Sequence, residues 1–188
     1  MTSAEIVPVV TSASSRYHRA QDIAGIWLAF LLLVALAVFS PEHQIDGIEA
    51  VAAFALGLGA GTFAAGMFLP LKRLFLWRAD LEEAVMDGAI RAFRTFGVGE
   101  TSGRTGVLIY VSLFERSAVV LGDVALARVL GPTDYAAVRD LLIDGMRRGQ
   151  PEAAFVAAIR KTGVILAERL PRNPDDQPEI TDNLRLLD

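Results

Sequence analysis

The side chains able to do chemistry in this chain are carboxylates and hydroxyls, because thiols are absent and imidazoles are scarce. The 188 residues contain no cysteine and only two histidines, His18 and His43. The chain therefore offers few histidines, and no cysteine, from which a zinc hydrolase site or a Ser-His-Asp triad could be built. Ser112 has no histidine base within expected reach. Nucleophilic catalysis is not expected, and no catalytic residue is assigned.

The overall composition narrows the class of protein. Hydrophobic residues make up 53% of the chain, charged residues 21%, and the mean hydropathy is +0.41. Disorder is excluded, because it requires low hydrophobicity and high net charge. The length suits about one domain, and a simple cytosolic domain would carry more charge. The net charge of −4 argues against nucleic acid as a partner, because binding to phosphates needs a basic surface.

Two uncharged apolar stretches account for the high hydropathy. The first covers residues 23–39, and the second lies within residues 48–71. The residues between them include Pro41, Asp46 and Gly47, which favour a turn. We interpret the stretches as two transmembrane helices forming a hairpin, with two buried helices of a soluble bundle as the alternative. The first stretch lacks a small–x–small cleavage pattern and is expected to be retained.

The basic residues predict the orientation of this hairpin. Arg16 and Arg19 precede the first stretch, and Lys72, Arg73 and Arg78 follow the second. The connecting loop has no Lys or Arg and carries three acidic residues, Glu42, Asp46 and Glu49. The positive-inside rule then predicts an inner (cytoplasmic) membrane protein with both termini in the cytoplasm.

Small residues recur every four positions along the second stretch: Ala53, Gly57, Gly61 and Ala65. Such a face lets two helices approach closely in lipid. We expect it to pack against the first stretch, opposite Leu32, Leu33 and Leu36. The alternatives are a membrane-protein partner or self-association through this second span. In either case the lipid bilayer itself is a predicted partner.

The chain after the membrane has the pattern of a small α/β unit. Apolar residues at helical spacing predict an amphipathic helix over 74–96. Residues 105–113 and 117–121 are rich in β-branched residues and predict a hairpin whose first strand is covered on both faces. Two further helices are predicted, one opening at Thr133-Asp134 and ending at Gly149, the other running from Pro151 to Pro171. Residues 172–188 are expected to be an extended acidic and proline-containing surface tail, with its last leucines pinned to the body.

A two-stranded hairpin is too small to be stable alone, so another strand is expected. Residues 5–11 (EIVPVVT) are the available candidate, and they lie before the membrane stretches. We therefore predict an α/β (α+β) domain with a small mixed β-sheet flanked by helices and split by the inserted hairpin. Its parts would be residues 1–17 and 72–171. Pro8 cannot donate a ladder hydrogen bond and predicts an edge position or a bulge. A loose tail over residues 1–16 is the alternative.

Several segments together resemble one known family. The run from Thr105 to Arg116, the strand from Ala118 to Asp123, the helix end at Met146–Phe155 and the opening Thr2–Val10 are similar to the TPM domain, including a bacterial membrane subgroup with a two-span hairpin inserted after the first strand. The resemblance covers residues 2–17 and 102–171. It departs from the family at Gly122–Ala125, where many members carry a glycine–aromatic–glycine turn. This departure weakens any activity that depends on that turn.

The resemblance implies a phosphatase-like activity or a role in maintaining membrane complexes, and calcium as a possible cofactor. Calcium binds six to eight hard oxygen ligands. Asp123 lies at a predicted strand end, with Asp134 and Glu5 as neighbours that the fold would bring near it. Asp134 also has a structural explanation, as a helix cap. Glu115 and Arg116 lie at the other end of the hairpin and are expected to form a solvated turn pair. Asp123, Asp134 and Glu5 are the metal-ligand candidates.

These observations favour a membrane-anchored TPM-like domain that acts without catalysis, as an accessory, assembly or maintenance factor of a membrane protein complex. The alternative is a metal-dependent phosphatase of low activity using Ca²⁺ or Mg²⁺. A pore or transporter subunit is disfavoured, because residues 23–39 and 50–71 contain no ionisable side chain.

Overall fold

A computed structural model describes residues 2–15, 17–39, 46–68, 76–172, 179–180 and 183–187. Several residues named above, Arg16, Glu42, His43, Lys72 and Arg73 among them, lie outside this part of the chain. The chain divides into two units. One combines Met1–Ser15 with Leu81–Asp188, and the other is Arg16–Asp80.

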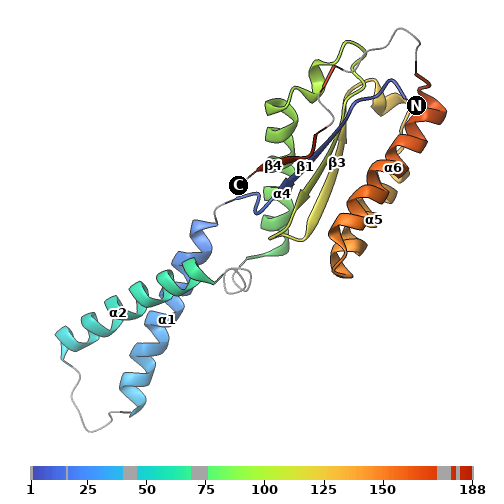
Figure 1. Ribbon diagram of the computed structural model, residues 1–188. Helices are drawn as coiled ribbons and strands as arrows, with labels where there is room; N and C mark the ends of the chain where they lie inside the picture. Colours follow the sequence, from blue (N-terminus) through green and yellow to red (C-terminus); the bar gives the residue numbers. More distant parts are fainter. Residues whose placement is uncertain are drawn as a thin grey trace. The chain divides into compact units, whose positions relative to one another are not determined.

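The first unit is built on a four-stranded mixed sheet with the order β3-β2-β1-β4 (Figure 1). Strand β1 (Ile6–Thr11) runs parallel to β2 (Val107–Ser112), and β2 pairs antiparallel with β3 (Ser117–Gly122). Val7 faces Leu108 in this register. The predicted fold class is confirmed, and the opening residues supply the strand that the hairpin needed.

Pro8 sits where its missing N–H costs no ladder bond. The Val107 and Leu113 N–H groups donate to the Glu5 and Thr11 carbonyls, so odd-numbered residues of β1 bond to β2. The even-numbered residues, Pro8 among them, point to the opposite edge. There β4 pairs only from Val9 onward. The nitrogen of Pro8 therefore faces the part of this edge that β4 leaves open. The expected edge position is wrong for the strand, because β1 lies between β2 and β4, but no ladder bond is lost at Pro8.

The C-terminal tail departs from the sequence expectation. Arg185–Leu187 form β4, which lies parallel to β1 with Val9 opposite Arg185 and Thr11 opposite Leu187. The tail was predicted to be an extended surface segment pinned by its last leucines. Leu187 does pack against the second core, and the strand itself is what the sequence did not predict. Three residues are too few to show an alternating pattern, so this strand has no signature in the sequence.

Helices cover both faces of the sheet (Figure 1). Helices α5 (Pro132–Arg147) and α6 (Pro151–Arg169) pack on one face, and α4 (Arg78–Thr95) packs on the other. Every residue of β2 is buried, with Ile109 in the first core and Leu108 in the second. This confirms the strand covered on both faces. Two short 3₁₀ helices, η1 (Val98–Glu100) and η2 (Leu126–Arg128), follow α4 and β3.

The ends of α5 and α6 follow the expected chemistry. Pro132 and Pro151 stand in the first turns, where a missing N–H breaks no helical bond. Gly149 has φ +71 between the helices, a left-handed conformation that glycine adopts without a steric penalty.

The second unit contains α1 (His18–Phe39) and α2 (Gly47–Met67). Within them, Gln21–Phe39 and Gly47–Met67 are long and apolar enough to span a membrane. At 1.5 Å per residue, 19 to 21 residues span about 30 Å, the thickness of a bilayer core. By length and composition these helices fit the predicted spans, and residues 69–71 of the second stretch lie outside the described part.

The small-residue face of α2 packs on α1. Gly57, Gly61 and Ala65 are buried and Ala53 is partly buried. A Cβ added to Gly61 would lie 2.7 Å from the Cα of Gly25, so only glycine fits. The nearest atoms opposite Gly57 and Gly61 belong to Ala24, Gly25, Ala29 and Leu32, so Leu32 lies where it was predicted. Leu33 and Leu36, also predicted opposite, are partly buried.

Candidate functional site

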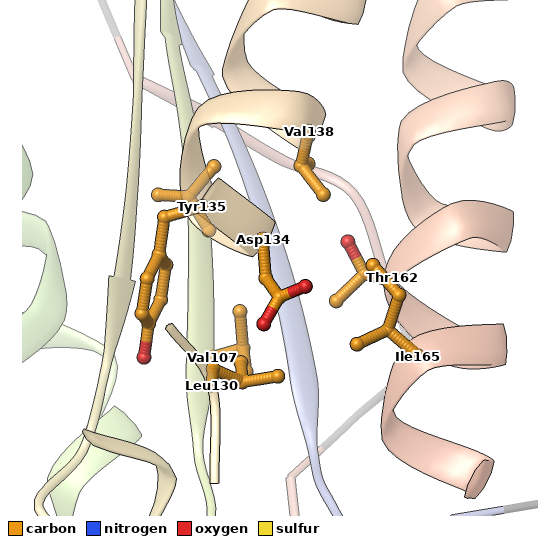
Figure 2. A pocket seen from close by; sticks show the side chains of 8 residues that line it. Val107, Leu130, Asp134, Tyr135, Val138, Thr162 and Ile165 are labelled. Atoms are coloured by element: carbon orange, nitrogen blue, oxygen red, sulfur yellow. The ribbon is translucent and has the colours of Figure 1, made fainter. Parts of the chain in front are cut away.

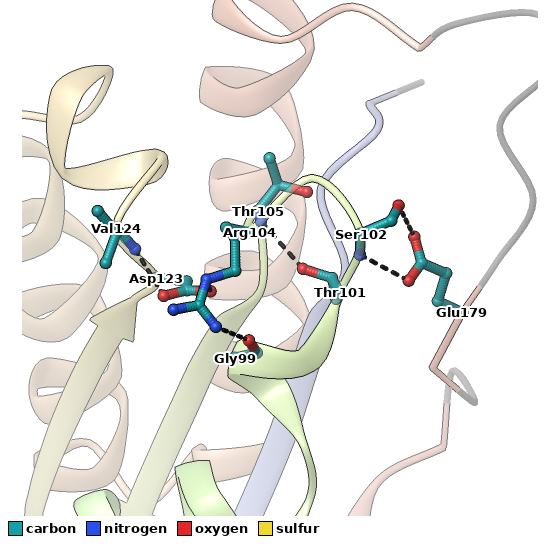
Figure 3. Close-up of polar contacts among 8 residues, drawn as sticks. All are labelled: Gly99, Thr101, Ser102, Arg104, Thr105, Asp123, Val124 and Glu179. Carbon is teal, nitrogen blue, oxygen red and sulfur yellow. Dashed lines mark hydrogen bonds and ion pairs between the residues drawn. The ribbon is translucent and has the colours of Figure 1, made fainter.

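Asp123, the leading candidate from the sequence, is a buried carboxylate at the end of β3. The residue is 6% exposed, and its Oδ1 accepts the Val124 N–H at 2.7 Å (Figure 3). Its Oδ2 lies 3.3 Å from the Arg104 Nε but makes no hydrogen bond. A buried carboxylate oxygen without a donor is costly, so this ion pair is what offsets its charge.

Arg104 closes the site from the loop before β2. Its side chain is 60% exposed, and its Nη1 donates to the Gly99 carbonyl at 2.6 Å (Figure 3). The backbone of Arg104 has φ +53, which is uncommon for a residue with a side chain. A Cβ added to Gly99 would lie 3.0 Å from the Phe93 ring, so glycine is what lets this loop approach α4.

The same loop is tied to the C-terminal tail. The Glu179 carboxylate accepts the Ser102 N–H at 2.8 Å and the Ser102 hydroxyl at 2.6 Å (Figure 3). Thr101 Oγ1 accepts the Thr105 N–H at 3.0 Å, which closes a turn within the loop. The loop is therefore held by hydrogen bonds to the residues around it, with Arg104 placed over Asp123.

Asp134 lies in the first turn of α5, where it accepts the Gly131 N–H at 2.9 Å. Its Oδ2 is also 2.6 Å from the Arg169 Nη1. The Gly131 N–H, followed by the Arg169 guanidinium, holds the pKa of the Asp134 carboxyl below its ordinary value. These contacts are those of a helix-capping residue.

Glu5 is the third metal-ligand candidate, and its Oε1 accepts the Glu179 N–H at 3.2 Å. Within the described residues, no group of three His, Cys, Asp or Glu side chains could hold a metal ion. The structure therefore gives Asp123, Asp134 and Glu5 separate partners rather than bringing them together.

The sheet unit has a small cavity beside Asp134 and a larger polar cleft near the tail. The cavity beside Asp134, between α5, α6 and the sheet, has a volume of about 10 Å³, enough for one water molecule (Figure 2). Burial, followed by the nearby Asp134 charge, raises the pKa of Tyr135 there. A polar cleft of about 310 Å³ lies between η1 and the tail. It is lined by Phe96, Gly97, Glu100, Thr101, Glu179, Ile180 and Arg185.

A second polar cluster, around Ser14, lies at the opposite end of β3 from Asp123. The Glu115 Oε1 accepts the Ser14 N–H at 2.8 Å, and its Oε2 accepts the Ser112 hydroxyl. The Ser14 Oγ lies 3.1 Å from the Tyr110 hydroxyl, and the Arg91 Nη2 donates to the Ser14 carbonyl at 3.0 Å. All three polar groups of Ser14 are thus held by other elements of the sheet unit.

This cluster corrects the sequence interpretation of Glu115 as a solvated turn residue, because Glu115 is only 5% exposed. Arg116 has φ +50, and this backbone turn accompanies the return of Glu115 toward Ser112. Burial is the main cause that raises the pKa of the neighbouring Tyr110. The cluster joins residues that are far apart in the sequence. Its one local signal was the presence of Ser112 three positions before Glu115, which could have indicated a hydrogen bond between the two side chains.

Comparison with known proteins supports the fold and gives no activity. No family model matches the chain, and no curated protein matches it. The chain is similar to the NMR structure of the BA42 protein from the psychrophilic bacterium Bizionia argentinensis. The TM-score is 0.57 at 18% identity, with 98% of this chain and 81% of that chain covered. At this identity the likeness supports the α/β fold alone.

Proposed function

We propose that this chain is a membrane-anchored TPM-like protein of the inner membrane, with both termini cytoplasmic, acting without catalysis as an accessory, assembly or maintenance factor of a membrane protein complex. The observation that carries the proposal is the insertion of two apolar helices between Ser15 and Leu81, two residues of one sheet unit. Both ends of the hairpin then return to the same domain, which favours an anchored binding domain.

The polar clusters support a role without catalysis. Arg104 covers the Asp123 carboxylate, and Asp134 caps α5. Glu115 is enclosed by Ser14 and Ser112. None of these three carboxylates lies beside both a nucleophile and a substrate-sized cavity, the arrangement that group transfer through a protein nucleophile uses.

The partner-binding part of the proposal is tested by cross-linking the full-length protein in native membranes, solubilising it in mild detergent and purifying it. The expected result is a stoichiometric membrane protein that co-purifies. The matched control is the hairpin alone, residues 16–80, in the same membranes. Recovery of the full-length chain without any stoichiometric partner contradicts this function.

The phosphatase alternative is tested on the same full-length protein, with a phosphate ester and Ca²⁺ or Mg²⁺. The expected result is no turnover above background. An Asp123→Asn variant is assayed in parallel. Metal-dependent turnover that this variant abolishes would assign the activity to Asp123 and replace the non-catalytic proposal.

A further inference from the structure

The polar cleft between η1 and the C-terminal tail is bounded by residues that are fixed to other elements of the sheet unit. Its volume of about 310 Å³ is at the lower end of the range for small-molecule sites. On the tail side, the Glu179 carboxylate accepts the N–H and the hydroxyl of Ser102 (Figure 3), and Ile180 packs against the second core. Arg185 is held by the pairing of β4 with Val9. The described tail residues of the cleft are thus held in place.

Arg185 supplies a positive charge that no other described residue neutralises. Its guanidinium lies 4.7 Å from the centre of the Phe96 ring, a cation–π contact that holds the planar group in place. Its Nε is buried without a hydrogen-bond partner, and no ion pair joins the side chain to a carboxylate in the described part of the chain. A buried donor without an acceptor is costly. A guanidinium fixed in this way is suited to a carboxylate, which can accept two parallel N–H bonds.

Glu100 supplies a negative charge on the η1 side of the same cleft. A Cβ added to Gly97 would lie 3.2 Å from the Glu100 Oε2, so a side chain at position 97 would crowd this carboxylate. Gly97 also has φ +63, a conformation that glycine adopts without a steric penalty. Glu100 and Arg185 both line the cleft, yet the structure shows no ion pair between them. The cleft therefore holds opposite charges that are separated from each other.

We propose that this cleft binds a small zwitterion of the α-amino acid class, with the ligand carboxylate on Arg185 and the ligand ammonium on Glu100. A zwitterion neutralises both charges of the cleft at once, whereas a simple anion or cation leaves one of them without a partner. The Glu179 carboxylate already accepts hydrogen bonds from Ser102, so Glu100 is the carboxylate assigned to the ammonium. This inference goes beyond the proposed function and does not rest on it, because the cleft lies wholly within the sheet unit.

The test uses the full-length protein in detergent and a set of ligands that differ by one charged group. L-alanine carries both charges, propionate lacks the amino group, and ethylamine lacks the carboxylate. Isothermal titration calorimetry is expected to show binding of L-alanine, with each analogue at least about tenfold weaker, because each loses one charge-assisted contact. Propionate or ethylamine binding as tightly as L-alanine would overturn the assignment to a zwitterion. No binding of L-alanine at concentrations up to about 10 mM would overturn the site itself.

Two variants that each remove one charge locate the binding in the cleft. Arg185→Gln and Glu100→Gln are each expected to weaken L-alanine binding at least about tenfold. The matched controls are Arg160→Gln and Glu152→Gln, at exposed positions of α6, and both should bind L-alanine as the unsubstituted protein does. Glu100 is exposed and lies outside β4, so its replacement tests the cleft without disturbing that strand. Unchanged L-alanine binding in either the Arg185→Gln or the Glu100→Gln protein would overturn the proposal.

Discussion

At the scale of single residues, the negative charges of two buried carboxylates in the sheet unit are stabilised in different ways. Glu115 accepts two hydrogen bonds, from the Ser14 N–H and the Ser112 hydroxyl. Asp123 accepts one, from the Val124 N–H, and faces the exposed Arg104 guanidinium with its other oxygen. Hydrogen bonds from buried donors fix a carboxylate more firmly than an exposed ion pair does. We therefore expect Glu115 to stabilise the fold and Asp123 to tolerate change better.

Replacing Glu115 by Ala is expected to destabilise the sheet unit by about 2–4 kcal/mol, because it leaves the buried Ser14 N–H and Ser112 hydroxyl without their acceptor. The measurement is urea unfolding of the full-length protein in detergent. Glu152→Ala, at an exposed position in the first turn of α6, is the control. A Glu115→Ala variant as stable as this control would contradict the assignment.

Asp134 gives the molecule a pH dependence whose sign follows from its lowered pKa. A carboxyl whose pKa is lower in the folded chain stabilises the fold above its ordinary pKa, and this contribution is lost as pH falls through the folded value. Asp134→Asn is therefore expected to lose stability at pH 7 and to show a smaller further loss on acidification below about pH 4. Unfolding midpoints of both proteins across pH 2.5–7, roughly the range in which carboxyls titrate, measure this.

Asp140→Asn is the matched control for that titration. Asp140 is exposed and pairs with the adjacent Arg139 at 2.7 Å. Exposed pairs of this kind contribute little to stability. Equal acid sensitivity of the Asp134→Asn variant and the unsubstituted protein would show that the Gly131 and Arg169 contacts do not stabilise the carboxylate.

At the scale of elements, the pairing of α1 with α2 depends on glycine. Gly61 meets the Cα of Gly25 so closely that no side chain fits, whereas Gly59, on the same helix, has nothing within 4 Å. The approach of the two backbones is limited by this contact, and Leu32 and Leu58 pack beside it. The hairpin is thus specified by positions where side chains are absent, which is typical of close helix packing in lipid.

Gly61→Leu is expected to separate α1 from α2 and to destabilise the hairpin by about 1–3 kcal/mol, the usual cost of overpacking. Gly59→Leu is the control, with little effect expected. Spin labels at Ile26 and Phe63, both exposed positions of the helices, report the distance between them. An unchanged distance distribution in the Gly61→Leu protein would contradict the close packing.

At the scale of the whole molecule, more of the fold than of the candidate site could be predicted from the sequence. The central strand, the hairpin, the first strand before the inserted helices and the helices α5 and α6 all follow from apolar periodicity and from glycine and proline positions. Strand β4 was not predicted, because three residues show no period. The Ser14 cluster was not predicted, because Arg91, Tyr110 and Glu115 meet Ser14 only through the fold.

The measurement that tests the account most directly is the membrane topology of the inserted hairpin, read with single cysteines in this cysteine-free chain. Gln44→Cys lies in the sequence between the end of α1 at Phe39 and the start of α2 at Gly47, and Val156→Cys is at an exposed position of α6. In intact spheroplasts, a membrane-impermeant maleimide is expected to label Gln44→Cys. Val156→Cys should be labelled only after permeabilisation. Labelling of both positions from the same side, or recovery of the protein in the soluble fraction, would contradict a sheet unit anchored by a membrane hairpin.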